Sequence, residues 1–202
     1  MKPYYERDGI TIYHGDCREF SMSVENASCV LTDPPYGADK AMWDEHSLPL
    51  PPFGPSVLAV AYTPGLSRVV EAPVMLGGLR YKWTLSAHLT NGMTRGAVGY
   101  GNWIACLLYG DIEFRKETDC RRFAVGTTEK PDHPCPKPLN AWRWFLSRLP
   151  SGCVLDPFMG SGTTLLAASL ESRRAIGIEI EERYCEIAAK RLSQRVMFGV
   201  TP

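Results

Sequence analysis

The chain has 202 residues and no net charge, because its 22 Lys and Arg residues are balanced by 22 Asp and Glu residues. Hydrophobic residues make up 45% and charged residues 22% of it, which is typical of a globular protein and excludes a disordered or fibrous one. The balanced charge neither supports nor excludes a nucleic-acid partner, because binding a polyanion needs a basic face rather than a basic total.

The predicted elements, in chain order, alternate between short apolar runs and helical patterns. Strands are expected at residues 10–13, 27–31, 57–62, 79–85, 103–109, 153–155 and 175–180. Helices are expected at residues 139–149, 163–171 and 181–195. The alternation predicts an α/β fold with helices on both faces of a mostly parallel sheet. The runs 79–85 and 103–109 have no helix between them, which predicts a hairpin with one antiparallel strand.

Two segments lack a clear periodicity and are expected to be irregular. Residues 37–55 and 111–138 are rich in proline and charged side chains, which makes both candidates for functional loops. Cations in the second segment could neutralise DNA phosphates, although a solvated charged loop would have the same composition. The basic residues proposed for this contact are Arg115, Lys116, Arg121 and Arg122.

The first candidate site is an Asp-Pro-Pro-Tyr turn, which follows the expected strand at 27–31. It comprises Asp33, Pro34, Pro35 and Tyr36. Ligands of open α/β sheets bind beyond the carboxyl ends of strands, where this turn lies. The Asp33 carboxylate and the Pro34 carbonyl could accept hydrogen bonds from an aromatic amine and so draw its lone pair back to the nitrogen. Tyr36 could stack on the base, which would have to leave the duplex. By itself, the tetrapeptide also fits a purely structural turn.

The second candidate site is a strand, a glycine-containing turn and a helix start. Its residues are Asp156, Pro157, Phe158, Gly160, Ser161, Gly162 and Thr163, and the next strand ends at Glu179. Glycines allow a ligand to approach the backbone, and an acid about 20 residues further on can reach ribose hydroxyls. No lysine follows Gly162, so the turn is not a P-loop. Asp156 disfavours a pyrophosphate and tolerates a cationic ligand such as S-adenosylmethionine, although packing glycines alone would give a similar turn.

Together, these two motifs resemble those of the DNA amino-methyltransferases, the N6-adenine and N4-cytosine family. The Asp-Pro-Pro-Tyr turn resembles the family's catalytic motif, and the turn at 156–164 resembles its cofactor loop. Because the catalytic motif comes first here, the order resembles the permuted β group of the family. The resemblance implies a circularly permuted, Rossmann-like fold of seven strands with one antiparallel strand. It also implies S-adenosylmethionine as cofactor and duplex DNA with a flipped base as substrate.

The resemblance extends to two further cofactor residues. Asp16 resembles the acid that contacts the adenine amine of the cofactor, and Lys137 could pair with the carboxylate of its methionine part. Cys135 departs from the residue expected in the segment around Lys137. The dipeptide Pro134-Cys135 also raises the alternative of a cytosine C5 methyltransferase with a thiolate nucleophile, but direct transfer to an amine needs no covalent intermediate.

These observations predict a single methyltransferase domain over residues 1–202. Its catalytic half covers residues 1–110, a short basic segment resembling a recognition region covers 111–132, and the cofactor half covers 133–202. The expected activity is site-specific methylation of DNA at adenine N6, as in a restriction-modification system. The alternatives are N4-cytosine methylation, methylation of RNA adenine, and a nucleic-acid-binding subunit without activity. A homodimer is common in the resembling group and remains open.

The cysteines and the apolar runs predict the cellular location of the protein. The seven cysteines are scattered and form no Cys-x-x-Cys pair, which disfavours a disulfide framework or a zinc site. No apolar run approaches the roughly 20 residues of a membrane span, and residues 1–7 lack a signal-peptide core. We therefore expect a cytoplasmic protein with reduced thiols, no membrane partner and no metal.

Overall fold

The computed structural model describes residues 2–20, 27–34, 55–64, 69, 72, 74–90, 94–95, 100–113, 116–124 and 137–197. Its strands are β1 (Tyr5–Arg7), β2 (Ile10–His14), β3 (Cys29–Thr32), β4 (Ala59–Tyr62), β5 (Met75–Leu76), β6 (Leu79–Leu89), β7 (Thr94–Arg95), β8 (Tyr100–Gly101), β9 (Trp103–Gly110), β10 (Cys120–Phe123), β11 (Val154–Asp156) and β12 (Ala175–Glu179). Its helices are the 3₁₀ turn η1 (Cys17–Glu19) and the α-helices α2 (Leu139–Leu146), α3 (Thr163–Leu170) and α4 (Glu182–Met197). All the predicted strands and helices are therefore confirmed, with ends that shift by a few residues.

Ten of the strands form one sheet in the order β1-β2-β12-β11-β3-β4-β9-β6-β10, with β5 paired to β6. The strands from β2 to β4 in this order run parallel, and β9 is antiparallel to both of its neighbours. The strand β11, which precedes the expected cofactor turn, lies beside β3, which precedes the Asp-Pro-Pro-Tyr turn. The two candidate motifs are thus neighbours in the sheet although they are far apart in the sequence, as in the permuted fold that the resemblance implies.

The predicted number of seven strands is too small for this sheet, because β1, β5 and β10 were missed. All three lie at or near its margins, and their side chains are largely exposed. A marginal strand needs no apolar alternation, so its sequence carries little strand signal. In particular, the prediction that residues 111–138 are irregular is wrong over Cys120–Phe123, which pairs in parallel with β6.

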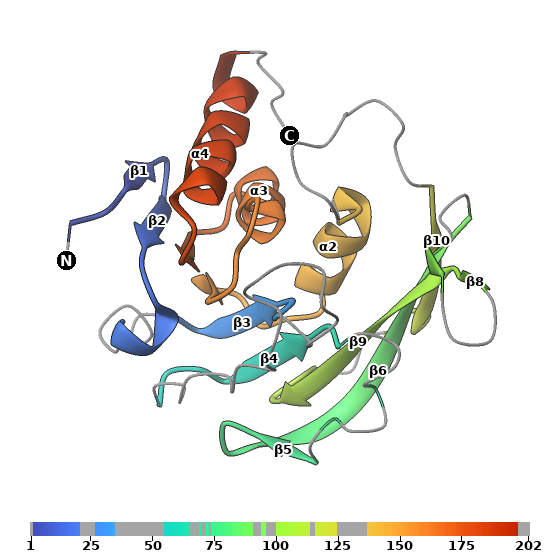
Figure 1. Ribbon diagram of the computed structural model, residues 1–202. Coiled ribbons are helices and arrows are strands. Elements are labelled where there is room, and N and C mark those ends of the chain that lie inside the picture. The colour runs from blue at the N-terminus through green and yellow to red at the C-terminus, as the bar shows by residue number, and fades with distance from the viewer. Residues whose placement is uncertain are drawn as a thin grey trace.

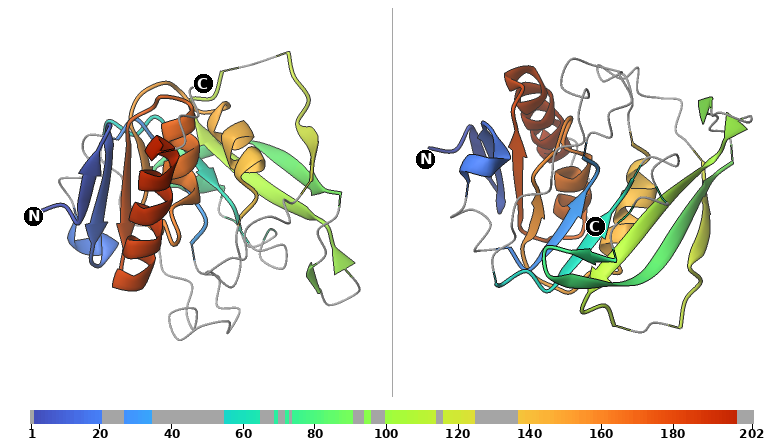
Figure 2. Two further views of the ribbon diagram at one scale, coloured as in Figure 1. Left: turned by 90° about the horizontal axis from the view of Figure 1, so that it is seen from above. Right: turned by 60° about the horizontal axis from the view of Figure 1, so that its bottom comes forward.

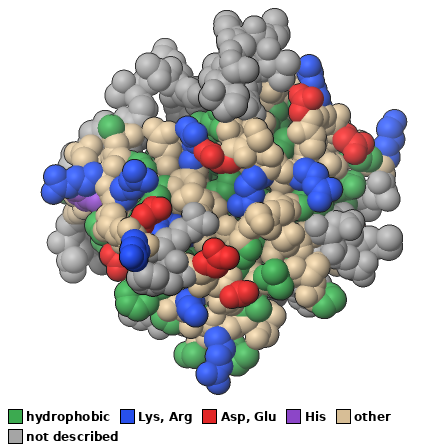
Figure 3. Space-filling view, turned by 180° about the vertical axis from the view of Figure 1, so that it is seen from behind, with side chains coloured by type: hydrophobic (Ala, Val, Ile, Leu, Met, Phe, Trp, Pro, Cys, Tyr) green, Lys and Arg blue, Asp and Glu red, His purple; other side chains and the backbone are tan. Residues whose placement is uncertain are grey.

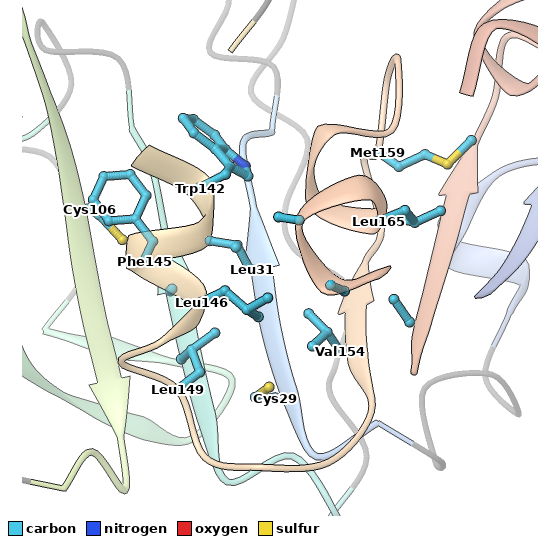
Figure 4. Packing of buried hydrophobic residues seen from close by; sticks show 14 of the residues in the cluster. Cys29, Leu31, Cys106, Trp142, Phe145, Leu146, Leu149, Val154, Met159 and Leu165 are labelled. Carbon is cyan, nitrogen blue, oxygen red and sulfur yellow. The ribbon is translucent and has the colours of Figure 1, made fainter. Parts of the chain in front are cut away.

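The three α-helices of the described residues pack against the same face of the sheet. Figure 1 shows α4, α3 and α2 side by side along it. Their buried side chains form one core with the strands, here named the helix-side core, in which Phe145 lies beside Cys106 and α2 covers Leu31 (Figure 4). A second core on the other face contains Val30, Val60, Leu107 and Ile178.

Among the described residues, that second face is covered by no α-helix; Cys17 of η1, Phe20, Ala72 and Leu76 pack against it. Helices were predicted on both faces of the sheet, and the described residues place them on one face. Residues 21–26 and 35–54 lie outside the described residues. No described helix has the length and the apolar character needed to cross a membrane. The described cysteines are all free thiols.

Strands β6 and β9 form a long hairpin at one side of the sheet, as predicted for the runs 79–85 and 103–109. They pair in antiparallel register from Tyr81 to His88. The short strands β7 and β8 pair with each other beyond the end of β6, and Figure 2 shows them at the tip of the hairpin. The hairpin therefore extends past the ends of the parallel strands, which end at the candidate site.

Candidate active site

A pocket of about 330 Å³ lies at the carboxyl ends of β2, β12, β11 and β3. Its volume falls in the range of small-molecule sites. It is lined by these residues from the predicted site: Asp16, Asp33, Lys137, Asp156, Pro157, Phe158, Gly160, Ser161, Thr163 and Glu179. These residues come from five separate regions of the sequence, and the fold brings them into one cavity.

The glycine turn between β11 and α3 forms one wall of the pocket. Gly160 and Gly162 have φ values of +50° and +78°, which side chains with a Cβ rarely adopt. A Cβ on Gly162 would lie 2.7 Å from the Cβ of Ala188, so α4 packs directly against the turn. Arg191 of α4 also donates hydrogen bonds to the carbonyl and the hydroxyl of Ser161, at 2.7 Å and 3.2 Å. The turn is thereby fixed from the side opposite the ligand space.

Asp156 lies at the floor of the pocket and is almost fully buried. Its Oδ1 accepts hydrogen bonds from the Thr32 hydroxyl at 2.9 Å and from the Phe158 backbone N–H at 3.1 Å. Burial raises the pKa of this carboxyl group to about 7, despite these hydrogen bonds. A cationic group bound beside Asp156 would favour its charged form, which suits the ammonium group of an amino acid.

Glu179 ends β12 and joins that strand to the glycine turn. Its two carboxylate oxygens accept hydrogen bonds from the backbone N–H groups of Gly160 and Glu181, each at 2.9 Å. Burial raises the pKa of Glu179. A carboxylate can accept about four hydrogen bonds, so its remaining lone pairs are available to hydroxyl groups in the pocket. The same side chain can therefore hold the turn and bind a ribose.

Asp33 follows β3 and faces the pocket together with Lys137, which precedes α2. The two side chains form an ion pair. The Thr63 hydroxyl donates a second hydrogen bond to Asp33, at 2.8 Å, and so orients the carboxylate. The expected partner of Lys137 is the carboxylate of the cofactor, whereas in this structure Lys137 pairs with the catalytic candidate. The ammonium group of Lys137 thus lies in the wall of the pocket, beside Asp33.

Asp16 lies on the opposite side of the pocket, at the start of η1. Its Oδ1 accepts hydrogen bonds from the backbone N–H and the guanidinium Nε of Arg18, each at 2.9 Å. These hydrogen bonds lower the pKa of Asp16, so the group is a carboxylate at neutral pH. This is the charge state required of an acceptor for an amine.

The structure adds pocket residues that the sequence did not predict. They are Gly15, Cys17, Arg18, Trp142, Ile180 and Tyr184, while Met159 and Thr164 belong to the predicted turn at 156–164. Ile180 directly follows Glu179 and is 56% exposed. Its position just after the acid at the end of a strand was the sequence signal by which this pocket residue could have been found. Trp142 is buried in the helix-side core, and it also lines the pocket.

Several predicted residues lie beside the pocket or outside the described structure. Pro34 and Gly162 are buried next to it. Pro35, Tyr36, Arg115 and the alternative nucleophile Cys135 lie outside the described residues. Lys116, Arg121 and Arg122 are exposed, and the two arginines belong to β10.

Comparisons with known proteins agree with this site. The model of the DNA methylase family of N6 and N4 methyltransferases matches residues 93–190, which include the glycine turn and Glu179. The type II methyltransferase M2.LlaDCHI of Lactococcus lactis subsp. cremoris is 25% identical over 98% of this chain and 95% of its own length. The orphan methyltransferase M.BamHII of Bacillus amyloliquefaciens is 52% identical over 44 residues, which are 22% of this chain and 17% of that protein.

A solved structure agrees in fold. The crystal structure of the M1.HpyAVI–SAM complex superposes with a TM-score of 0.67 at 25% identity and covers 90% of this chain and 99% of that one. The α/β methyltransferase fold, the pocket at the carboxyl ends of four strands and the sequence matches all indicate the same kind of protein. The chain is thus similar to the N6 and N4 DNA methylases over residues 93–190, and it shares its fold with a methyltransferase solved with the methyl donor S-adenosylmethionine.

Proposed function

We propose that this protein transfers a methyl group from S-adenosylmethionine to the exocyclic amine of a base flipped out of DNA, with adenine N6 as the target. The observation that carries the proposal is that Asp33 opens into the same pocket as Asp156, the glycine turn and Glu179. A nucleophile held at Asp33 would thus lie next to the methyl donor. Chemistry on a base requires such extrusion, because the amine is inaccessible inside the duplex.

The donor groups of the pocket fit S-adenosylmethionine. We assign Glu179 to the ribose hydroxyls, Asp156 to the ammonium group and Asp16 to the adenine amine. The turn from Pro157 to Thr163, which lines the pocket, would hold the cofactor through its backbone. The sulfonium of the bound cofactor supplies an electrophilic methyl group. The three carboxylates suit this cationic ligand and would repel a nucleotide pyrophosphate.

The chain's own residues activate and position the amine. The Asp33 carboxylate and the Pro34 carbonyl accept hydrogen bonds from its two N–H groups, which increases the lone-pair density on the nitrogen. The carboxylate can accept the proton that the nitrogen loses after it has gained the methyl group. Lys137 must release Asp33 for this to occur, and the methionine carboxylate of the cofactor is the partner we assign to it. Tyr36 and Pro35 complete the motif, with Tyr36 proposed to stack on the base.

Methyl transfer to unmethylated genomic DNA from labelled S-adenosylmethionine, followed by nucleoside mass spectrometry, tests this proposal. A rise in N6-methyladenine is the expected result, and the mapped positions would give the recognition sequence. N4-methylcytosine would retain the mechanism and change the base. Asp at the first position of the motif favours adenine, whereas Ser would favour cytosine. Label in RNA alone, or cofactor binding without transfer to any nucleic acid, would refute DNA methylation.

We also propose that the chain works as a single methyltransferase domain with three functional parts. Residues 1–110 supply the catalytic strand, and residues 133–202 supply the cofactor turn. Residues 111–132 include β10, whose exposed side chains are available to DNA. The adjacency of β3 and β11 supports this division, because it joins the first and third parts in one site.

The buried Asp156 predicts a pH-dependent affinity for the cofactor. Because burial raises its pKa to about 7, the group is largely protonated below that pH in the free protein. An ammonium ligand binds the carboxylate form, so affinity is expected to rise about tenfold between about pH 6 and pH 8. Calorimetric titration with S-adenosylmethionine across this range measures it. Asp156→Asn is expected to bind more weakly with little pH dependence, and an equally steep dependence in this variant would assign the titration to another group.

The contact of Arg191 with the glycine turn predicts a specific role in cofactor binding. Arg191→Met removes the hydrogen bonds to Ser161 and is expected to raise the KM for S-adenosylmethionine about tenfold, with a much smaller change in kcat. Lys190→Met is the matched control, because the neighbouring Lys190 pairs with Glu186 on the exposed side of α4. Partial recovery in Arg191→Lys would support positioning of the turn. Equal KM values in the Arg191 and Lys190 variants would contradict it.

A further inference from the structure

Three neighbouring strands bring an arginine, a histidine and a tryptophan into one row. Arg122 of β10 is in register with His88 of β6, and His88 is in register with Trp103 of β9. Side chains in register across neighbouring strands point to the same face and lie about 5 Å apart. The Asn102 amide nitrogen lies 3.0 Å from Nε2 of His88 and so fixes the imidazole at the centre of the row. We name Arg122, His88 and Trp103 the hairpin row.

The hairpin row points away from the helices. Ala87, Ile104 and Phe123, which alternate with the members of the row, belong to or pack against the helix-side core. Successive side chains of a strand point to opposite faces, so the row occupies the other face. The same register places Arg121 in line with Ala87, on the helix-bearing face. Two consecutive arginines therefore point in opposite directions.

The side chains of the row are accessible and basic in character. Trp103 is 40% exposed, and Tyr100 on β8, just before it in the sequence, is 72% exposed. Arg122 is exposed, and among the described residues it forms no ion pair. The acidic residues that precede β10 are engaged elsewhere: Asp119 accepts a hydrogen bond from the Trp83 indole, and Glu117 pairs with Arg148. A cation beside exposed aromatic rings suits nucleic acid, which offers phosphates and the faces of bases.

The described part of the face in Figure 3 carries no continuous basic field. Figure 3 shows basic and acidic side chains interspersed over the described part of the face it presents. With a net charge of zero, contact with a polyanion must come from local groups of side chains. The hairpin row is such a group.

The row also stands at the correct end of the sheet. The pairing of strands aligns Thr32, at the end of β3, with Tyr62, Leu107 and Thr84. His88 lies four residues beyond Thr84, so the row extends about 13 Å past the end of β3. Its members lie on the second, third and fourth strands from β3, which is about 10 Å for Trp103, about 14 Å for His88 and about 19 Å for Arg122. The row thus rises beside the pocket at a distance that nucleotides flanking a base at Asp33 can reach.

We propose that the hairpin row is a contact surface for the DNA strand that flanks the flipped base. Arg122 pairs with a phosphate, and Trp103 stacks on an unstacked base or packs against a sugar. His88 holds the two at a fixed spacing, and Arg121 has no part in this surface. The inference rests on the proposed methylation of DNA, and it names the face of β6, β9 and β10 on which the DNA lies.

Fluorescence anisotropy with a labelled DNA duplex, at low and at physiological salt, tests the surface. Arg122→Ala is expected to weaken binding about tenfold and to reduce the salt slope of log Kd by about one. Arg121→Ala removes the same charge from the same strand and is expected to bind like the wild type. Trp103→Ala is expected to weaken binding at least about fivefold, whereas Trp103→Phe retains most of the affinity. Thermal melting of each variant separates lost contacts from lost folding.

The outcomes distinguish this surface from the proposed activity. Equal affinities of the Arg121 and Arg122 variants, in a protein that methylates DNA, would refute the hairpin row alone. A difference between the two arginines in a protein that transfers no label to DNA would refute the methylation and retain the surface. Failure of the wild-type protein to bind DNA would refute the surface.

Discussion

Replacement of Asp33 by alanine is expected to lower the rate of methyl transfer by about a thousandfold, the scale of losing a positioned acid–base group. The variant lacks the carboxylate that accepts a hydrogen bond from the target amine, so the nitrogen keeps its lone pair in the ring. The affinity for S-adenosylmethionine is expected to change little, because the assigned cofactor contacts come from Asp16, Asp156 and Glu179. Single-turnover transfer of labelled methyl groups, with calorimetric titration of the cofactor, measures both quantities.

Two variants make this result specific. Asp33→Asn keeps the size of the side chain and one acceptor, and it is expected to retain little activity because it cannot take up the proton. Thr63→Val removes the hydroxyl that orients Asp33, and a smaller loss of about tenfold is expected because the carboxylate itself remains. If Asp33→Ala retained most of the activity, the proposed mechanism would be wrong. A large loss of cofactor affinity in that variant would instead assign Asp33 to cofactor binding.

Replacement of Glu179 by alanine is expected to weaken the binding of S-adenosylmethionine by about 1.5–3 kcal/mol, or roughly 10- to 150-fold, as for the loss of a buried charged hydrogen bond. The carboxylate is proposed to bind the ribose, and it also accepts the N–H groups of Gly160 and Glu181. Its removal therefore takes away a ligand contact and loosens the glycine turn. Calorimetric titration gives the affinity, and kcat at saturating cofactor is expected to fall much less.

The neighbouring acid provides the control for Glu179. Glu181→Gln alters a side chain that pairs with Arg183, and it is expected to leave the cofactor affinity nearly unchanged. Glu179→Gln keeps one acceptor oxygen and is expected to lie between the wild type and the alanine variant. If the glutamine variant bound as tightly as the wild type, the negative charge of Glu179 would have no role in recognition.

The sequence predicted the sheet well where its strands are buried. The runs that became β3, β4, β11 and β12 are apolar because both of their faces are covered, and such runs stand out against polar turns. The pocket residues of the turn at 156–163 could be predicted for a related reason. Glycines between a strand and a helix, with an acid before and an acid after, form a recognisable sequence pattern. Both ligand binding and the local fold require these residue types.

The remaining features depend on contacts that no local pattern encodes. Strand β10 has the sequence Cys-Arg-Arg-Phe and is held by pairing with β6, which is distant in the chain. Its arginines looked like part of a basic loop, but the strand directs them to opposite faces. The ion pair of Lys137 with Asp33 likewise joins residues that only the fold brings together. The contact of Arg191 with Ser161 also joins residues that are distant in the sequence.

The position of β11 and β12 in the sheet has a consequence for how the chain acquires its structure during synthesis. Although β2 and β3 are consecutive large strands in the sequence, β12 and β11 are inserted between them. Until the last quarter of the chain has left the ribosome, β2 and β3 each present an unsatisfied edge, separated by a gap two strands wide. Pairings of such high sequence separation form slowly, and open edges invite association with other chains. The catalytic strand β3 is therefore synthesised early, but its pairing on both sides is completed only when β11 is available. The nascent protein depends on its C-terminal strands for protection from aggregation.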